Sequence, residues 1–274
     1  MIRPCGSSSD NLRSLVAMLG LALLTPLAMA QSPPIVQLQY SADMGANIVG
    51  ASRFAARRDY VVDGLVGNRS ALSIPGLPDR VDLTDFHIDP NGDVLFCLDV
   101  GTSLGGAYFT PADVIRRSAG IFSKFFDAAA AGVPAGVRCD GVARSGIAGS
   151  LLLSFDRTFA VAGVTVRPAD VIAFAGGFGA KVIDSSALGI AARLNVDAVD
   201  SIGTTSDLLV SFDTGGQVAG VIFADEDILQ LRLSDSTWSK RFRVLDFSER
   251  WGAANLDGLA TAPNADILFN NGFE

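Results

Sequence analysis

The chain has 274 residues, of which 49% are hydrophobic and 18% are charged, so it carries enough apolar side chains to build a folded core. Its formal net charge is −8 at pH 7, and it has no basic stripe that could neutralise phosphates, which argues against a nucleic acid as a partner. His87 is the only histidine, so zinc sites that need paired histidines, such as H-E-x-x-H, are excluded as well.

Residues 1–30 have the pattern of a secretory signal peptide. Arg3 and Arg13 supply its positive front, residues 15–27 are its apolar run, and residues 28–30 (Ala-Met-Ala) form a small-x-small cleavage site. The apolar run is shorter than the roughly 20 residues that a membrane span needs, which argues against an uncleaved anchor. No later stretch is long and apolar enough to span a bilayer. We therefore expect export to the periplasm, the cell surface or the medium.

The rest of the chain repeats at a period of about 57 residues, which is typical of a repeat architecture. Three similar segments end in aspartates at this spacing: Asp99, Asp156 and Asp213. A second aspartate recurs once per unit: Asp59, Asp113, Asp170 and Asp227. The lysines of the chain keep the same register: Lys124, Lys181 and Lys240. Chance does not place three independent sets in one register, so we interpret the units as structural repeats.

Each unit contains four short β signals separated by turn residues, and strong helical periodicity is absent. In one unit the signals lie near Asp82 and at residues 93–99, 111–115 and 121–127. The second signal (VLFCL, LLLSF or LLVSF) is apolar throughout rather than alternating, so we expect neighbouring units to cover both of its faces. These features predict an all-β, β-propeller-like fold of about four four-stranded units.

The two ends of the repeat region predict how such a ring closes. Residues 35–43 resemble a second strand and a first strand begins near Asp257, so the C-terminal strand would complete the N-terminal blade and remove the open sheet edges. Residues 265–269 form a surplus strand that either replaces the N-terminal one or lies outside the blade, and an open array of units is the alternative. We divide the chain into a signal peptide (1–30), a single repeat domain (31–264) and a tail or closing strand (265–274).

Two cysteines, Cys97 and Cys139, follow the signal peptide, and an oxidising compartment favours a disulfide between them. The bridge would close a loop of about 43 residues and, in the chain-entropy model, stabilise the fold by roughly 4 kcal/mol. The alternative is a pair of buried free thiols that act as small hydrophobic residues.

The once-per-unit aspartates have two interpretations. An aspartate at a strand entry accepts hydrogen bonds from the N–H groups of a turn, and recurrence in every unit favours this structural role. Alternatively, carboxylates around a channel mouth would bind a cation such as Ca²⁺, for which the densest cluster, Asp225, Glu226 and Asp227, is the best candidate. We expect no other cofactor.

No catalytic set is recognisable in the sequence. Residues 101–105 match G-x-S-x-G, but a strand-like segment follows instead of a helix, and His87 precedes the serine, contrary to the order in hydrolases. His87 has no counterpart in the other units, so we expect a satisfied strand residue; the alternative is an acid or base at the mouth of a channel.

Residues 196–231 resemble the repeats of exported bacterial proteins of uncharacterised function, whose units follow the pattern D-A-x(5)-D-G-x-L-L-L-S-F-D and then D-E-D-I. The match extends over most of residues 54–269. The ending ILFNNGFE (267–274) resembles I-F-x-x-G-F-E endings of exported proteins of Gram-negative bacteria. The resemblance implies export and a propeller-like fold, and it implies no particular activity.

Together these observations predict an exported, non-catalytic β-repeat protein that acts as a binding or interaction module, with a protein or a glycan as its partner. Two alternatives stay open. One is a calcium-assisted propeller hydrolase that uses the acidic cluster at residues 225–227, and the other is a surface structural protein held by its C-terminal tail.

Overall fold

The computed structural model describes residues 37–43, 55–63, 69–145, 150–202, 207–243 and 255–261. The chain divides into two compact units, residues 1–31 and 32–274, and every described residue lies in the second. Within these ranges the chain forms only strands, turns and bends, so nothing described there is a helix that could cross a membrane. The predicted signal peptide and the surplus strand at residues 265–269 lie outside the described residues.

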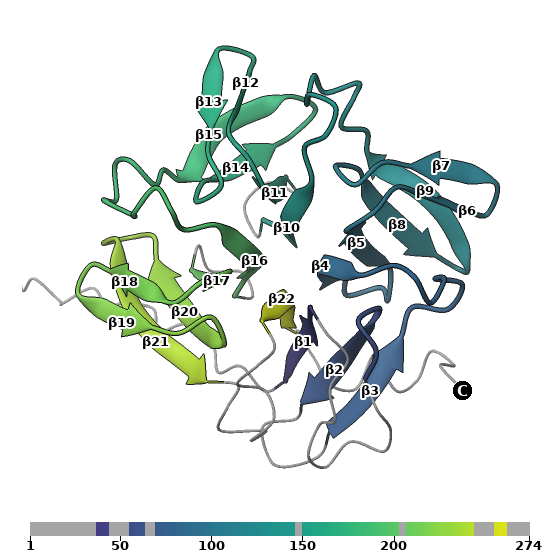
Figure 1. The fold of residues 1–274 in the computed structure, drawn as a ribbon, viewed down its shortest axis with the longest axis horizontal. Helices are drawn as coiled ribbons and strands as arrows, with labels where there is room; N and C mark the ends of the chain where they lie inside the picture. Colours follow the sequence, from purple (N-terminus) through teal and green to yellow (C-terminus); the bar gives the residue numbers. More distant parts are fainter. Residues whose placement is uncertain are drawn as a thin grey trace, which may run out of the picture. The chain divides into compact units, whose positions relative to one another are not determined.

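Four antiparallel sheets of four strands form the blades of a ring (Figure 1). The first blade contains β22 (Leu256–Thr261), β1 (Leu38–Ala42), β2 (Asp59–Asp63) and β3 (Arg69–Ser73). The second contains β4 (Leu83–Ile88), β5 (Val94–Leu98), β8 (Val114–Ser118) and β9 (Ile121–Phe126). The third contains β10 (Cys139–Arg144), β11 (Leu151–Phe155), β14 (Val171–Phe174) and β15 (Phe178–Ile183). The fourth contains β16 (Val196–Ser201), β17 (Leu208–Phe212), β20 (Asp227–Arg232) and β21 (Thr237–Arg243).

The first blade is assembled from both ends of the described chain. β22 pairs antiparallel with β1, from Leu38 opposite Thr261 to Ala42 opposite Leu256. The inner strands β22, β4, β10 and β16 contact one another in succession around the ring. The prediction of a four-bladed β-propeller closed by a C-terminal strand is therefore confirmed, because β22 covers the edge of β1 and completes the first blade.

The continuously apolar second strands lie between two blade interfaces, as their sequence predicts. In β5, which is buried along its whole length, Leu95 and Cys97 pack in the core shared with the third blade. Val94, Phe96 and Leu98 of the same strand pack in the core shared with the first blade. A strand whose two faces both meet apolar neighbours is mostly apolar and does not alternate with polar residues.

Three short hairpins between the second and third strands were not predicted. They are β6–β7 (Thr102–Leu104, Ala107–Phe109), β12–β13 (Phe159–Val161, Val164–Val166) and β18–β19 (Gly216–Val218, Val221–Phe223). Each turns on two residues with positive φ: Gly105–Gly106, Ala162–Gly163 and Ala219–Gly220. This is the twist that a two-residue hairpin requires, so the recurring x-Gly pair was the signal that could have revealed the hairpins.

One position of each second strand connects its blade to the next. Ser41 Oγ donates to the Leu83 carbonyl at 3.4 Å. In the same way, Ser154 donates to Val196 at 3.1 Å and Ser211 donates to Leu256 at 3.4 Å. We call the interface between two neighbouring blades a seam. At the remaining seam the equivalent pair is the disulfide between Cys97 and Cys139, whose Cα atoms are 6.0 Å apart. The predicted disulfide thus lies where the other three seams have a hydrogen bond.

Candidate functional site

The aspartates that end the second strands fix the start of each inner strand. Their carboxylates accept the backbone N–H of the residue that opens the inner strand of the same blade. The pairs are Asp99 with Asp82 (2.7 Å), Asp156 with Arg138 (2.7 Å), Asp213 with Asn195 (3.2 Å) and Asp43 with Asn255 (2.9 Å). This repeated contact makes Asp82 the counterpart of Arg138, Asn195 and Asn255.

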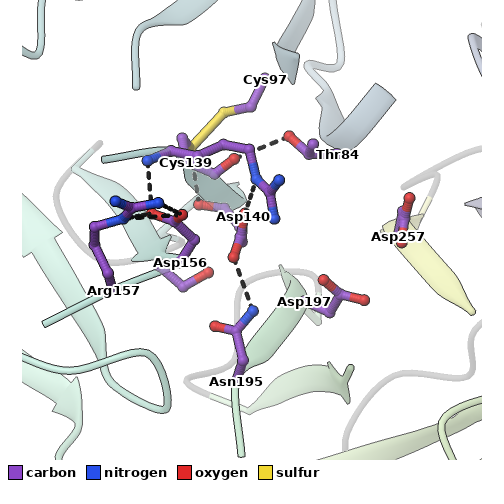
Figure 2. A network of polar contacts seen from close by, with 12 residues as sticks. Thr84, Cys97, Cys139, Asp140, Asp156, Arg157, Asn195, Asp197 and Asp257 are labelled. Atoms are coloured by element: carbon purple, nitrogen blue, oxygen red, sulfur yellow. Dashed lines mark hydrogen bonds and ion pairs between the residues drawn. A yellow bond between two sulfur atoms is a disulfide. The ribbon is translucent and has the colours of Figure 1, made fainter. Parts of the chain in front are cut away.

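The position two residues further along each inner strand forms what we call the acidic ring: Thr84, Asp140, Asp197 and Asp257. At two seams an asparagine of the next blade binds the carboxylate. Asn195 Nδ2 donates to Asp140 at 2.8 Å (Figure 2), and Asn255 Nδ2 donates to Asp197. Thr84 Oγ1 instead donates to the Cys139 carbonyl at 2.9 Å. At the seam between the first and second blades, Asp82 stands in the place of the asparagine. Asp257 therefore meets a carboxylate where the other two aspartates meet an amide.

Burial raises the pKa values of the three aspartates of this ring and of the neighbouring Asp82, and the charges of nearby aspartates add to the shift. Burial, together with the charges of Asp197 and Asp82, raises the pKa of Asp257 to about 10. Burial also raises the pKa of Asp82 to about 7, although Arg57 at 3.4 Å opposes the shift. The pKa of Asp197 lies well above its ordinary value, first because of burial and then because of the charge of Asp140. A carboxyl group that is desolvated and faces like charges favours its neutral form.

One step further along the inner strands, Asp85 lies among all four blades. Its carboxylate accepts N–H groups from the other three inner strands, at 2.6 Å from Val142, 2.9 Å from Leu259 and 3.3 Å from Val199. Burial raises the pKa of Asp85 well above its ordinary value, and the backbone donors oppose the shift. The equivalent residues of the other blades are small: Gly141, Ala198 and Gly258. A single carboxylate therefore occupies the meeting point of the inner strands.

The other end of the inner strands holds His87. Its Nδ1 lies 2.9 Å from Asp200 Oδ1, and Asp200 Oδ2 accepts the backbone N–H of Thr261 at 2.6 Å and its hydroxyl at 2.7 Å. The strand registers make Ala143 and Asp200 the counterparts of His87. The sequence repeat aligns Asp82 with Asp140 and Asp197 and so places Ser145 and Ile202 opposite His87, two residues beyond the counterparts that the strand pairing shows. The serine of the G-x-S-x-G match, Ser103, is an exposed residue of β6 at the opposite end of the blade.

The once-per-unit aspartates lie before or at the start of the third strands. One carboxylate oxygen of each accepts the backbone N–H three residues earlier, from Ala56, Thr110, Arg167 or Ala224. The lysine of the same blade binds the aspartate in three cases: Lys124 to Asp113 at 3.1 Å, Lys181 to Asp170 at 2.6 Å, and Lys240 to Asp227. These ion pairs explain why the lysines follow the repeat period. In the first blade the basic residue of the third repeat register is Arg69, and it binds Asp63 at 2.8 Å.

The predicted calcium ligands are consecutive: Asp225 and Glu226 precede β20, and Asp227 is its first residue. Asp227 accepts from Ala224 and Lys240, and Glu226 lies 3.9 Å from Arg243. The described residues contain no group of three or more His, Cys, Asp or Glu side chains that could hold a metal ion. The calcium site at residues 225–227 stays a sequence-based prediction.

The three hairpins and the acidic ring lie at the same end of the propeller, which we call the hairpin face. Each hairpin follows directly on Asp99, Asp156 or Asp213, whose carboxylates hold the starts of the inner strands. One side of each hairpin is buried against its blade, as Leu104 and Phe109 show for β6–β7. The other side projects a residue at one repeated position: Tyr108, Thr165 and Ile222. Tyr108 is 60% exposed and Ile222 is 73% exposed.

No family model and no curated protein sequence matches the chain. Similar solved structures include the hemopexin fold protein CP4 from cow pea, at 10% identity and a TM-score of 0.41 over 76% of this chain and 98% of that one. A nidogen/laminin complex matches at 11% identity and a TM-score of 0.37, over 82% and 97% of the two chains. YCF48 bound to a D1 peptide matches at 8% identity and 0.35, over 68% of this chain and 48% of that one. These scores are too low to support an argument, so the fold assignment rests on the strand pairing.

Proposed function

We propose that this chain is an exported, non-catalytic propeller that binds a partner protein on its hairpin face. The observation that supports it is the repeated hairpin. Three blades extend the same short hairpin toward solvent from the same end of the ring, and two of the three project a large apolar side chain at the equivalent position. Aromatic side chains such as that of Tyr108 are enriched in the interfaces of protein complexes.

The hairpins hold their exposed side chains in place before any partner arrives. A Cβ atom at Gly101 would lie only 2.2 Å from the Tyr108 hydroxyl, so the tyrosine ring extends over the backbone of this glycine. The turns at Gly105–Gly106 and Ala219–Gly220 fix the strands that carry Tyr108 and Ile222. An anchor that is already ordered loses little conformational entropy on binding, and aromatic anchors dominate the energy of many interfaces.

Two further features support binding over catalysis and export over retention. In the part of the chain that the structure describes, His87 is hydrogen-bonded to Asp200, and the only hydroxyl in the motif of a serine nucleophile, that of Ser103, lies at the other end of its blade. The pattern of residues 1–30 and a disulfide between Cys97 and Cys139 both suit an oxidising compartment outside the cytoplasm.

The test compares two matched variants of the full chain. Tyr108→Ser with Ile222→Ser removes both hairpin anchors, whereas Ile121→Ser removes an apolar side chain that is 70% exposed at the opposite end of the second blade. Wild type and both variants are cross-linked in cells to their neighbours, and the cross-linked bands are compared. We expect the hairpin variant to lose a protein band that Ile121→Ser keeps. Equal bands in all three chains, or turnover of an ester, phosphate or glycan substrate by the purified protein, would overturn the proposal.

A further inference from the structure

The outer strand of each blade is an edge strand, and β9, β15 and β21 differ in how well their sequences prevent pairing with another chain. β21 (TWSKRFR) carries three basic side chains, which would repel the same strand of another copy. β15 (FGAKVI) contains a glycine, and two irregularities interrupt its register with β14. β9 (IFSKFF) has a single charged residue, and its register with β8 is regular over residues 121–124. β9 is therefore the least protected of these three edges.

The side chains of β9 leave an apolar surface with little free charge at this edge. Ile121 is 70% exposed. Phe125 packs beside the core between the second and third blades and Phe122 beside the core between the first and second, so Ile121 lies on the same face as Phe125. Lys124 keeps its charge within its own blade, because it binds Asp113 at 3.1 Å. In the described part of the chain no strand pairs with the outer side of β9, which is thus a template for another strand.

The turn that precedes β9 determines which of its backbone groups face outward. Both residues of the turn at 119–120 have positive φ (47° and 81°), and in such a two-residue turn the flanking residues hydrogen-bond to each other. Because this pattern alternates along antiparallel strands, Ile121 and Ser123 bond to β8. Phe122 and Lys124 therefore direct their N–H and C=O groups away from β8, and a partner strand must meet them with outward-facing groups of its own.

We propose that the chain forms a two-fold symmetric dimer in which the β9 strands of two copies pair antiparallel about Ser123. With Ser123 on the axis, Phe122 lies opposite Lys124 of the other copy, so the outward-facing backbone groups match. Ile121 then lies opposite Phe125 of the other copy, and the dimer covers the exposed isoleucine with an apolar ring. Pairing about Lys124 would place two lysines opposite each other, which disfavours that register.

Sedimentation of the full chain over a range of concentrations tests whether the dimer forms. A single strand pair is a small interface, so we expect a dissociation constant in the micromolar range. Ile121→Lys should weaken the dimer by at least about tenfold, because it places a charge against Phe125 of the other copy. Ala180→Lys is the matched control at an exposed position of β15, and it should leave the dissociation constant within about twofold.

A cysteine on the two-fold axis tests the register. Residues of a non-hydrogen-bonded pair have Cα atoms about 4.5 Å apart, which is within the range that a disulfide spans. In chains that also carry Cys5→Ser, Ser123→Cys should link two copies under mild oxidation at least about tenfold faster than Ala180→Cys or Ser239→Cys. The two controls place an exposed cysteine at the same position of the other blades, one residue before the lysine. Non-reducing gels measure the linked fraction.

The positions that are changed are all exposed, and urea unfolding checks that each variant is folded. A wild-type chain that is monomeric at every concentration would overturn the proposal, as would equal rates of linking in the three cysteine variants. The dimer is separate from the proposed function. In the cellular cross-linking experiment, Ile121→Ser should weaken a band of two copies, whereas Tyr108→Ser with Ile222→Ser should keep that band and lose the band of the partner protein.

Discussion

Single residues beside the axis decide how closely the inner strands approach. Gly141 and Gly258 stand opposite Ser154 and Ser41 on the neighbouring strands, and a Cβ atom at either glycine would lie 2.2 or 2.3 Å from the serine hydroxyl. The glycines are required by this close approach and not by a left-handed backbone conformation. Their small size also leaves the meeting point of the strands to Asp85.

We expect Gly141→Ala to destabilise the fold by about 1–3 kcal/mol, because neither the Ser154 hydroxyl nor Val199 can move without disturbing a blade interface. Gly177→Ala is the matched control: its Cβ would meet no atom within 4 Å, so its unfolding free energy should stay close to wild type. Urea unfolding measures both. Adding Ser154→Ala to Gly141→Ala should recover part of the loss. A Gly141→Ala chain as stable as the control would contradict the steric argument.

At the scale of the strand, one position of the second strand connects each blade to the next, either by a hydrogen bond or by a disulfide. Serine donates to a carbonyl of the next blade at three seams, and a cysteine pair bridges the fourth. The bridge joins β5 to β10, which are neighbours in the ring and already share a buried core. The disulfide therefore reinforces a contact that the fold makes at every seam.

Replacing the bridge with the serine pattern tests this equivalence. Cys97→Ser with Cys139→Val copies Ser154 and Val196, and we expect a folded chain that has lost up to about 4 kcal/mol of stability. Cys97→Ala with Cys139→Val should be less stable than the serine version by about 1 kcal/mol, the contribution of one hydrogen bond. Urea unfolding of the two variants gives the difference. Equal stabilities would show that a serine at position 97 forms no hydrogen bond to the next blade.

The acidic pair at the first seam predicts how stability depends on pH. The folded chain holds the protons of Asp82 and Asp257 up to pH values of about 7 and about 10, whereas an unfolded aspartate releases its proton near pH 4. The folded state thus binds more protons than the unfolded state between these limits. Its stability is highest below about pH 4 as far as these two groups are concerned, and it falls as the pH rises.

We expect Asp257→Asn to remove much of this loss of stability at high pH, because an amide would then face the carboxylate of Asp82, as an amide faces a carboxylate at two other seams. Its Tm should exceed that of wild type at pH 8.5 by more than at pH 5. Asp184→Asn is the control, since the hydrogen bond from the Ser186 hydroxyl lowers the pKa of that carboxyl and the substitution should lower the Tm by a similar amount at both pH values. Parallel Tm curves for wild type and Asp257→Asn would contradict the predicted proton uptake.

At the scale of the whole molecule, ring closure depends on one noncovalent strand pair. β22 supplies the inner strand of the first blade, and its removal would expose the edge of β1 and the apolar faces of two neighbouring blades. Deleting residues 255–274 should therefore abolish cooperative unfolding and cause aggregation. Deleting residues 262–274 keeps β22 and should preserve a single urea transition. Loss of that transition in the shorter deletion would assign closure to residues 265–269 instead.

The sequence alone determined the number of blades, their strand pattern and their closure. Each follows from a local property that repeats: the apolar second strand, the aspartate at each strand entry, and the incomplete units at the two ends. The sequence also favoured a bridge between Cys97 and Cys139, because no other cysteines follow the predicted signal peptide. The three-residue strands of the hairpins escaped prediction because they are too short to show a period.

Only the tertiary structure decided which residues meet across the ring. The strand pairing differs by two residues from a match of the aspartates in the sequence, so Asp82 belongs with Asn195 and Asn255, and Thr84 belongs with Asp140, Asp197 and Asp257. The acidic pair at the first seam, the single carboxylate of Asp85 among four strands and the hairpins gathered on one face all join residues from different units. The physical reason is that a repeat specifies each blade by contacts within about 57 residues, whereas the ring brings together chain segments that are one to three units apart.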